Sequence, residues 1–513
     1  MTTYTLRSAS PAKTRADVVI VGVARNGKGP TIATGGEDVA TAYGRKFRPL
    51  LASLGFTGKV GETAKIPTSG TINAPLLLLV GLGDQQKLTP AVVRRATGAA
   101  SRAVTNAASV ALALPAESPE LVRAVTEGYL LGGYTFTDFK RDSLPESTAA
   151  GEIVVLSSIA RQQEAVAAFD RAQLFVEAQN LTRQWVNRPA NDLNPPSFAD
   201  EVVAQHAALT KGRGAPKIDL KVWDEKDLAA DGCGGILGVG GGSETPPRMV
   251  RLTWSPEGAT GHVALVGKGI TYDSGGYTIK PANSMVTMKE DMAGAASVIQ
   301  ALFLIARLGL PVKVTAWAPM AENMISGAAM RPGDVLTIRG GTTVEVTNTD
   351  AEGRLILADA LVMAAEEKPD TIIDIATLTG AMVVALGEKV AGLMGSDDVV
   401  ADVEAAAQST GEAFWHMPIP DEMAERIKSS KVADIAQHDW VRWGGGLFAA
   451  AFLREFTDGI PWAHLDIAGP GYNTGGAHGH TPPGGTGFGV ATLVEYVAAR
   501  AEAASAEAAS GDA

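Results

Sequence analysis

Short apolar runs that end in glycine or polar residues recur along this chain, and they alternate with segments of helical periodicity. Residues 17–23 and 76–81 are strand-sized runs, whereas residues 38–54 and 89–106 carry apolar side chains at the spacing of helix turns. Such alternation predicts parallel strands covered by helices. Because 46% of the residues are hydrophobic, the chain can bury a large core. The predicted fold class is α/β, with two domains that each contain a mostly parallel or mixed sheet flanked by helices.

The same patterns predict further elements in both halves of the chain. Strands are expected at residues 110–114, 152–156, 218–222, 249–254, 262–266, 312–318, 343–346, 371–375 and 462–466, and helices at residues 117–131, 161–186, 293–308, 352–367 and 447–456. A loop rich in proline and asparagine at residues 187–196 interrupts the pattern. We therefore predict an N-terminal domain over residues 1–180, a C-terminal domain over residues 181–500, and a frayed or disordered tail over residues 501–513.

Charge is unevenly distributed between the two parts. Residues 1–150 carry 17 Lys and Arg against 11 Asp and Glu, the remainder carries 27 against 45, and the net charge is −12. An acidic protein is poorly suited to a role confined to nucleic acid or to anionic membranes. Two domains with different surfaces explain the asymmetry, and an added nucleic-acid-binding role of the basic part is the alternative.

The single cysteine, Cys233, excludes an intrachain disulfide and a cysteine-built metal cluster. The first residues contain no apolar signal segment, and the apolar runs are shorter than the roughly 20 residues that span a bilayer. We therefore expect a cytoplasmic protein that has no membrane association.

Charged residues gather where predicted strands end or predicted helices begin, in three segments: 266–280, 288–296 and 346–355. They are Lys268, Asp273, Lys280, Asp291, Asp350 and Glu352. Taken singly, each acid could be a helix cap or a partner of a helix dipole. Ligands of doubly wound folds, however, bind beyond the carboxyl ends of strands. These residues are therefore candidates for one common site.

Acids that converge in this way would repel one another strongly in the absence of a cation. Carboxylate oxygens suit Mg, Mn or Zn, and the sequence offers no Cys or His cluster as a competing ligand set. A pair of divalent ions that binds water and substrate oxygens is a common use of such carboxylates in hydrolases. From the residues alone, a phosphoesterase remains an alternative to a peptidase. His478 and His480 could also bind a metal, but a solvated glycine-rich loop is the simpler interpretation.

The octapeptide at residues 348–355, Asn-Thr-Asp-Ala-Glu-Gly-Arg-Leu, resembles the signature of the leucyl aminopeptidase (cytosol aminopeptidase) family at every position. Further segments that resemble the family, in its order and spacing, are residues 267–276, 291–296, 331–336, 376–381 and 462–469. The resemblance covers roughly residues 180–500. The first 180 residues resemble the family only in size and α/β character.

This resemblance implies a metallo-aminopeptidase that removes Leu-like N-terminal residues from peptides with a free N-terminus, through water activated by two metal ions. It also implies two divalent ions per subunit (Zn or Mn) and a homohexamer. The residues that match the family's metal ligands are Lys268, Asp273, Asp291, Asp350 and Glu352. Lys280 and Arg354 match its catalytic pair, and Arg354 would hold a bicarbonate ion. The residues that match the pocket for the first side chain are Met288, Thr377, Leu378, Gly380 and Ala468.

The sequence departs from the usual family pattern near this site. Tyr277 and Thr278 replace the commoner small or aliphatic residues before Lys280, and Glu290 places an extra acid beside Asp291. These departures bear on side-chain preference and loop closure rather than on the chemistry.

Overall fold

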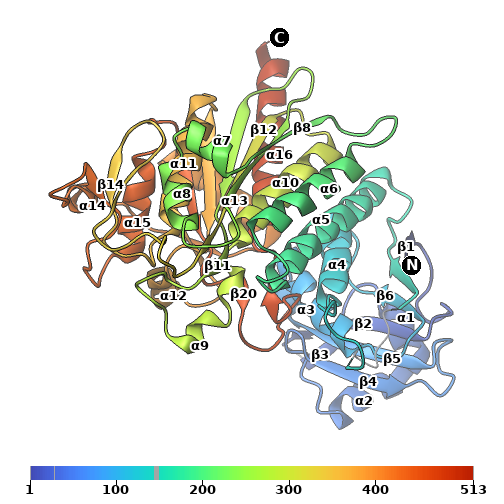
Figure 1. Cartoon of the computed structure of the whole chain (residues 1–513). Helices are drawn as coiled ribbons and strands as arrows, with labels where there is room; N and C mark the ends of the chain where they lie inside the picture. The colour runs from blue at the N-terminus through green and yellow to red at the C-terminus, as the bar shows by residue number, and fades with distance from the viewer. Residues whose placement is uncertain (1, 28, 144–149, 512–513) are drawn as a thin grey trace. The chain divides into compact units, whose positions relative to one another are not determined.

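The computed structural model describes residues 2–27, 29–143 and 150–511, which form two α/β units (Figure 1). The first unit comprises Met1–Asn180 and Gly475–Pro483, and the second comprises Leu181–Thr474 and Gly484–Ala513. The excursion Gly475–Pro483 joins the first unit through a close backbone approach, because a Cβ at Gly98 would lie 2.5 Å from the Cα of His480. The predicted α/β class is confirmed.

The sheet of the first unit has the strand order β1-β7-β6-β2-β5-β4, with β3 beside β2. Its strands are β1 (Thr3–Arg7), β2 (Val18–Asn26), β3 (Gly29–Ile32), β4 (Thr63–Pro67), β5 (Leu76–Asp84), β6 (Ser109–Ala113) and β7 (Glu152–Leu156). Strands β3 and β4 are antiparallel to their neighbours, and the other pairs are parallel. The sheet is therefore mixed.

Helices cover both faces of this sheet. They are α1 (Glu37–Tyr43), η1 (Gly44–Lys46), α2 (Phe47–Ser53), η2 (Gln85–Lys87), α3 (Pro90–Ala103), α4 (Pro119–Gly132) and the start of α5 (Gln163–Asn187). Successive side chains of β2 point to opposite faces of the sheet. Ile20 packs in the hydrophobic cluster that includes α3 and α4, and Val21 packs in the cluster that includes α1 and α2. The single helix predicted over residues 38–54 is wrong, since the chain leaves the α-helical conformation at Gly44, where φ is 58°.

The large sheet of the second unit has the order β17-β16-β19-β15-β10-β12-β9-β8, with β11 beside β12. Its strands are β8 (Ile218–Trp223), β9 (Arg248–Trp254), β10 (His262–Gly267), β11 (Gly269–Asp273), β12 (Lys313–Asn323), β15 (Thr371–Ala376), β16 (Ala391–Gly395), β17 (Phe414–His416) and β19 (Trp462–Asp466). The central strands β19, β15, β10 and β12 are parallel to one another, and every residue of β10 and β15 is buried. Smaller sheets contain β13 (Val335–Thr337), β14 (Thr343–Glu345), β18 (Ile435–Ala436), β20 (Tyr472–Asn473) and β21 (Gly484–Gly485).

Helices also flank this sheet. They are α6 (Pro195–Leu209), α7 (Glu225–Ala230), α8 (Gly234–Gly240), α9 (Ala282–Met285), η3 (Met288–Glu290), α10 (Ala293–Leu308), α11 (Gly353–Glu366), α12 (Gly380–Leu386), α13 (Asp397–Thr410), α14 (Asp421–Ile427), α15 (Gly445–Arg454) and α16 (Val490–Gly511). Helix α10 packs with α16, and α11 packs with α8 and α15. Of the two alternatives for the C-terminal tail, the structure has a helix, which continues to Gly511.

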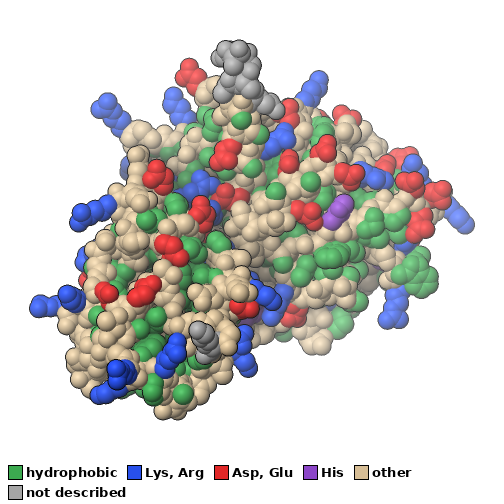
Figure 2. Space-filling view, turned by 180° about the vertical axis from the view of Figure 1, so that it is seen from behind, with side chains coloured by type: hydrophobic (Ala, Val, Ile, Leu, Met, Phe, Trp, Pro, Cys, Tyr) green, Lys and Arg blue, Asp and Glu red, His purple; other side chains and the backbone are tan. Residues whose placement is uncertain are grey.

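One helical stretch, Met288–Leu308, is long and apolar enough to cross a membrane by length and composition. It is also longer than any apolar segment expected from the sequence. Within the protein, 89% of its most apolar window is buried, so its composition is that of a central core helix. On the face shown in Figure 2, acidic and basic side chains are interspersed with apolar ones.

Candidate metal centre

The charged residues singled out from the sequence meet at the carboxyl ends of the central strands of the second unit. Lys268 directly follows β10, and Asp273 is the last residue of β11. Asp291 precedes α10, while Asp350 and Glu352 stand just before α11. Parallel strands end at one edge of a sheet, and this shared edge is why segments far apart in the sequence converge.

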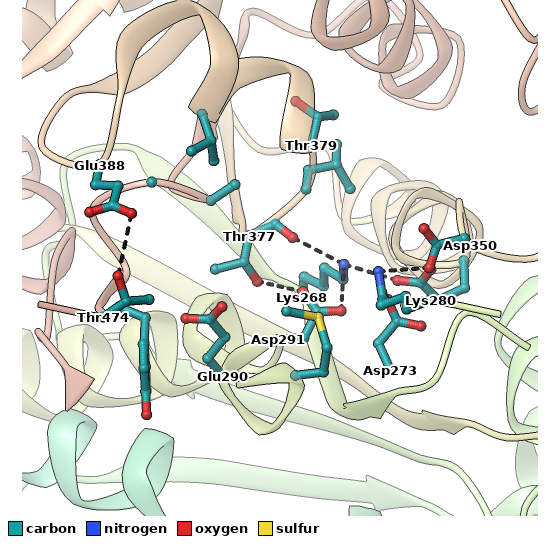
Figure 3. A pocket seen from close by; sticks show the side chains of 18 residues that line it. Lys268, Asp273, Lys280, Glu290, Asp291, Asp350, Thr377, Thr379, Glu388 and Thr474 are labelled. Carbon is teal, nitrogen blue, oxygen red and sulfur yellow. Dashed lines mark hydrogen bonds and ion pairs between the residues drawn. The ribbon is translucent and has the colours of Figure 1, made fainter. Parts of the chain in front are cut away.

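Two lysines lie among four carboxylates at this edge (Figure 3). Lys268 Nζ lies 2.8 Å from Asp291 Oδ2 and 3.0 Å from Glu352 Oε1. Lys280 Nζ lies 2.8 Å from Asp273 Oδ2 and 2.6 Å from Asp350 Oδ1. If all four carboxylates were ionised, the two ammonium groups would not balance their negative charge.

The arrangement of the carboxylates suits divalent cations. Asp273, Asp350 and Glu352 each place an oxygen within 4.8 Å of the others. Glu352 Oε2 is buried and has neither a hydrogen bond nor an ion pair with any described residue. A buried carboxylate oxygen without a partner is costly, and a metal ion is one group that would satisfy it. The donor set therefore fits hard or borderline divalent ions such as Mn or Zn.

The pKa values in the cluster reflect this crowding. Burial, together with repulsion from Asp273 and Glu352, raises the pKa of Asp350 to about 7. Burial also raises the pKa of Asp291 well above its ordinary value. Burial would likewise raise the pKa of Glu352, but Lys268 and Lys280 hold it below its ordinary value. Burial by itself would lower the pKa of Lys268. The negative charges of Asp291 and Glu352 outweigh this effect, so the pKa lies above its ordinary value.

Hydrogen bonds join the loop that bears Asp273 to the loop that bears Asp350. Asn323 Nδ2 donates to Asp273 Oδ1 (2.8 Å) and to the carbonyl oxygen of Thr349 (3.0 Å). The Thr349 hydroxyl donates to the carbonyl oxygen of Gly275 (2.7 Å) and accepts from the N–H of Thr278 (2.7 Å). These buried bonds fix the separation of the two acids.

A third loop, after β15, is held by Asp466 at the end of β19. Asp466 Oδ2 accepts from the Thr379 hydroxyl at 2.7 Å, and Oδ1 accepts from the N–H groups of Leu378 and Ala468, each at 3.2 Å. The Thr377 hydroxyl in turn donates to Asp291 Oδ1 at 2.7 Å. Asp466 is not among the site residues predicted from the sequence, although it carries the same signal as Asp273, an acid at the end of a strand.

Gln437, which is fully buried, organises the octapeptide loop from a distant segment. Its Oε1 accepts from the N–H groups of Thr347 and Asn348, each at 3.1 Å, and its Nε2 donates to the carbonyl oxygens of Asn348 and Ala351. Its own carbonyl accepts from Arg354 Nη1 at 2.6 Å. No motif signals this role, because Gln437 lies about 90 residues along the chain from the loop that it supports.

Arg354 is buried on α11, and one N–H group of its guanidinium has no acceptor among the described residues. Arg354 Nε has no hydrogen-bond partner among the described residues. Burial lowers the pKa of Arg354 to about 10. The N–H of Ala351, near the start of the same helix, already donates to the carbonyl oxygen of Asn348 at 3.1 Å.

A cavity of about 310 Å³ opens beside the carboxylates. Every residue expected to bind metal or to form the first-side-chain pocket lines this cavity, and so does Lys280. Arg354 is not among the described residues that line it. Residues not expected there are Thr379, Val383, Glu388, Gly469, Tyr472 and Thr474. Glu290 lies in the same wall, and burial raises its pKa to about 8. His478 and His480 are not among the described residues that line this cavity, and they belong to the segment Gly475–Pro483 of the first unit.

Comparison with known proteins connects this geometry to a family. The family model described as "Cytosol aminopeptidase family, catalytic domain" matches residues 180–494, and the model of the N-terminal domain of the same family matches residues 20–143. The chain belongs to the cytosol aminopeptidase family. The second match corrects the expectation that the first 180 residues resemble the family only in size and α/β character.

Individual relatives of this cytosol aminopeptidase family member align over nearly their whole length. A probable cytosol aminopeptidase of Streptomyces coelicolor is 47% identical over 514 residues, which cover 96% of this chain and 98% of the relative. The corresponding protein of Rhodococcus jostii is 44% identical, with 97% and 99% covered. A solved structure of the bottromycin maturation enzyme BotP in complex with Mn is 37% identical, with a TM-score of 0.81 over 95% of this chain and 100% of that chain.

Family membership fixes the class of chemistry. The chain is a metallopeptidase of the leucyl (cytosol) aminopeptidase type, and the substrates of such an enzyme are peptides. The residues alone also allowed a phosphoesterase, but the matches are to aminopeptidases.

Proposed function

We propose that this protein removes Leu-like N-terminal residues from peptides, with two divalent metal ions (Zn or Mn) bound at the carboxylate cluster. The observation that carries the proposal is the convergence of Asp273, Asp350 and Glu352 within 4.8 Å at the wall of a cavity. The similar solved structure of BotP is in complex with Mn, and this supports a divalent metal ion as the cofactor proposed here.

Five residues would hold the ions: Lys268, Asp273, Asp291, Asp350 and Glu352. When bound, a pair of divalent cations lowers the pKa of water and polarises a carbonyl oxygen. Lys268 would bind as a neutral amine, which requires loss of its proton. The carboxylates that raise the pKa of Lys268 would be neutralised by the ions, and this change favours the neutral amine.

Lys280 is placed to stabilise negative charge on the substrate. Its ammonium is anchored by Asp273 and Asp350 and lines the cavity, so it can donate to the carbonyl oxygen of the scissile bond as that oxygen becomes negative. Arg354 would hold a bicarbonate ion through its Nε, which has no hydrogen-bond partner among the described residues; a bound bicarbonate would supply a group for proton transfer.

The pocket for the first side chain is mainly apolar near the cluster. It is formed by Met288, Thr377, Leu378, Gly380 and Ala468, all of which line the cavity. Leu or Met side chains would bury their surface there without an unpaired charge. A free N-terminal amine would lie at the carboxylate end, which explains why only the first residue would be removed.

Aminoacyl-anilides with and without N-terminal acetylation provide the test. We expect Leu-anilide to be cleaved, chelation to abolish turnover, and Mn or Zn to restore it. Acetylation should remove cleavage because the free amine is needed at the site. Glu352→Gln and Lys280→Ala should each lower kcat/KM by about 100-fold or more, since changes beyond the ligands themselves already cost 10–100-fold in such sites. Cleavage of the acetylated substrate would contradict an exopeptidase.

We propose in addition a cytoplasmic location and a homohexamer. The word cytosol in the names of the relatives supports the location. Large apolar side chains at the surface support association: Val384 is 90% exposed, and Val286 and Trp443 are each 76% exposed.

A further inference from the structure

The cavity beside the carboxylate cluster has a second acidic end. Glu290 is the last residue of η3 and Glu388 follows α12, and both line the cavity on the side away from Lys280 (Figure 3). Neither belongs to the proposed ligand set. Among the residues that the structure describes, no Lys or Arg forms an ion pair with either of them.

Glu290 is a half-buried acid, and one of its carboxylate oxygens is buried without a partner among the described residues. Its side chain points into the cavity between Glu388 and Asp291 (Figure 3). Its Oε2 is buried and has no hydrogen-bond partner in the described parts of the chain. Burying a carboxylate oxygen without a partner is costly. A ligand that brings a positively charged donor to this wall would satisfy it.

Glu388 is held on the opposite wall by two contacts. Its Oε1 accepts from the Thr474 hydroxyl at 3.3 Å. Its backbone abuts the turn after β19, where a Cβ on Gly469 would lie 2.3 Å from the carbonyl oxygen of Gly387 and 3.3 Å from the Cα of Glu388. The close approach fixes the main chain, so the carboxylate stays at the cavity while it remains solvent-accessible.

Apolar side chains line the same cavity as the two acids. They belong to Met288, Leu378, Val383 and Ala468. A pocket of this composition, apolar with acids at one end, matches a side chain that has an apolar stem and a cationic head. Arg and Lys are the amino acids with that design, whereas Leu and Met can occupy only the apolar part.

We propose that Glu290 and Glu388 form a cation-recognising end of the first-side-chain pocket, so that the enzyme also accepts N-terminal Arg and Lys. The inference rests on the proposed function and adds to the Leu-like preference. A guanidinium with two carboxylates at the end of the pocket would form charge-assisted hydrogen bonds, which are stronger than those between neutral groups.

Matched substrates isolate the charge from the size of the side chain. Citrulline has nearly the shape of Arg without its charge, and norleucine stands in the same relation to Lys. We expect the wild-type holoenzyme to cleave Arg-anilide with a kcat/KM about tenfold or more above that of citrulline-anilide. Glu290→Gln and Glu388→Gln should each reduce this ratio several-fold, and the double variant should bring it close to one. Asp398→Asn, which changes an exposed acid on α13, should preserve it.

Each outcome decides for or against the inference. If Glu290→Gln fails to fold because it adjoins Asp291, Glu388→Gln alone tests the ratio, since Glu388 is exposed and outside the ligand set. A wild-type ratio near one, or a ratio that both variants leave unchanged, would overturn the inference while Leu-anilide turnover still supports the proposed function. Failure to cleave any free aminoacyl-anilide would overturn the proposed function and this inference with it.

Discussion

At the scale of single residues, four carboxylates and two ammonium groups share a site that burial has largely separated from water. Asp350 is the most accessible of the acids, with 31% of its side chain exposed, and its pKa is about 7. The proton that Asp350 retains in the metal-free protein is the one that a divalent ion would displace. Metal binding and stability are therefore linked to pH through this residue.

Asp350→Asn should change the pH dependence of stability in one direction. The folded pKa of Asp350, about 7, lies above the ordinary value of 3.8, so the folded state favours the protonated acid and loses stability as pH rises from about 4 to 7. Asn carries no such proton. We expect the melting temperature of metal-free Asp350→Asn to rise relative to wild type as pH increases from 5 to 8, by a few degrees. If the melting temperature of Asp350→Asn instead fell relative to wild type between pH 5 and 8, the raised pKa of Asp350 would be contradicted.

At the scale of elements, glycines allow helices to approach the strand ends that carry the site. A Cβ at Gly294 of α10 would lie 2.1 Å from the carbonyl oxygen of Ile375 at the end of β15. A Cβ at Gly353, the first residue of α11, would lie 2.4 Å from Lys268 Cε and 2.6 Å from Lys268 Nζ. A side chain at Gly353 would therefore collide with Lys268, and one at Gly294 would collide with the end of β15.

Gly353→Ala should therefore weaken metal binding more than it lowers the stability of the fold. Alanine favours a helix by about 1 kcal/mol over glycine, so the free energy of unfolding should not fall greatly. The new methyl group would displace Lys268 from Glu352, and we expect the affinity for Mn to fall about tenfold or more. Calorimetric titration measures this change. Gly327→Ala is the matched control, since Gly327 is exposed and a Cβ there meets no atom within 4 Å. Equal affinities in the two variants would count against the proposed position of Lys268.

Elements with a continuous apolar pattern could be predicted from the sequence, and those that depend on tertiary contacts could not. Helix α10 lies at the predicted residues, and β10 and β15 each extend one residue beyond the prediction. Helix α8 contains four glycines in seven residues and has weak helical propensity. It is held by α11: the N–H of Ile236 donates to Asp359 Oδ2 at 2.8 Å, and Gly235 approaches the carbonyl oxygen of Leu355.

The candidate site divides in the same way. Asp273, Asp291 and Glu352 could be predicted because each stands at a strand end or helix start within a recognisable motif. The supporting roles of Gln437 and Glu388 could not, because their partners lie about 90 residues away in the sequence and are brought close only by the fold.

At the scale of the whole molecule, the proposed hexamer is testable by mass. Exposed large apolar side chains in a folded protein favour association, and most oligomers of this kind are closed and symmetric. Light scattering should give about six times the chain mass of 53.0 kDa at the concentrations where the enzyme is active. A fully active species with the mass of a single chain would contradict this proposal.

The proposed centre consists of separate acidic turns of one domain that together bind two divalent ions. Equilibrium dialysis of the metal-free protein against Mn, followed by metal analysis, would count these ions. We expect two ions bound per chain, and fewer in Glu352→Gln, because that carboxylate contacts Lys268 and lies within 4.8 Å of Asp273 and Asp350. Binding of no Mn by the folded wild-type protein, or the same two ions in Glu352→Gln, would contradict it.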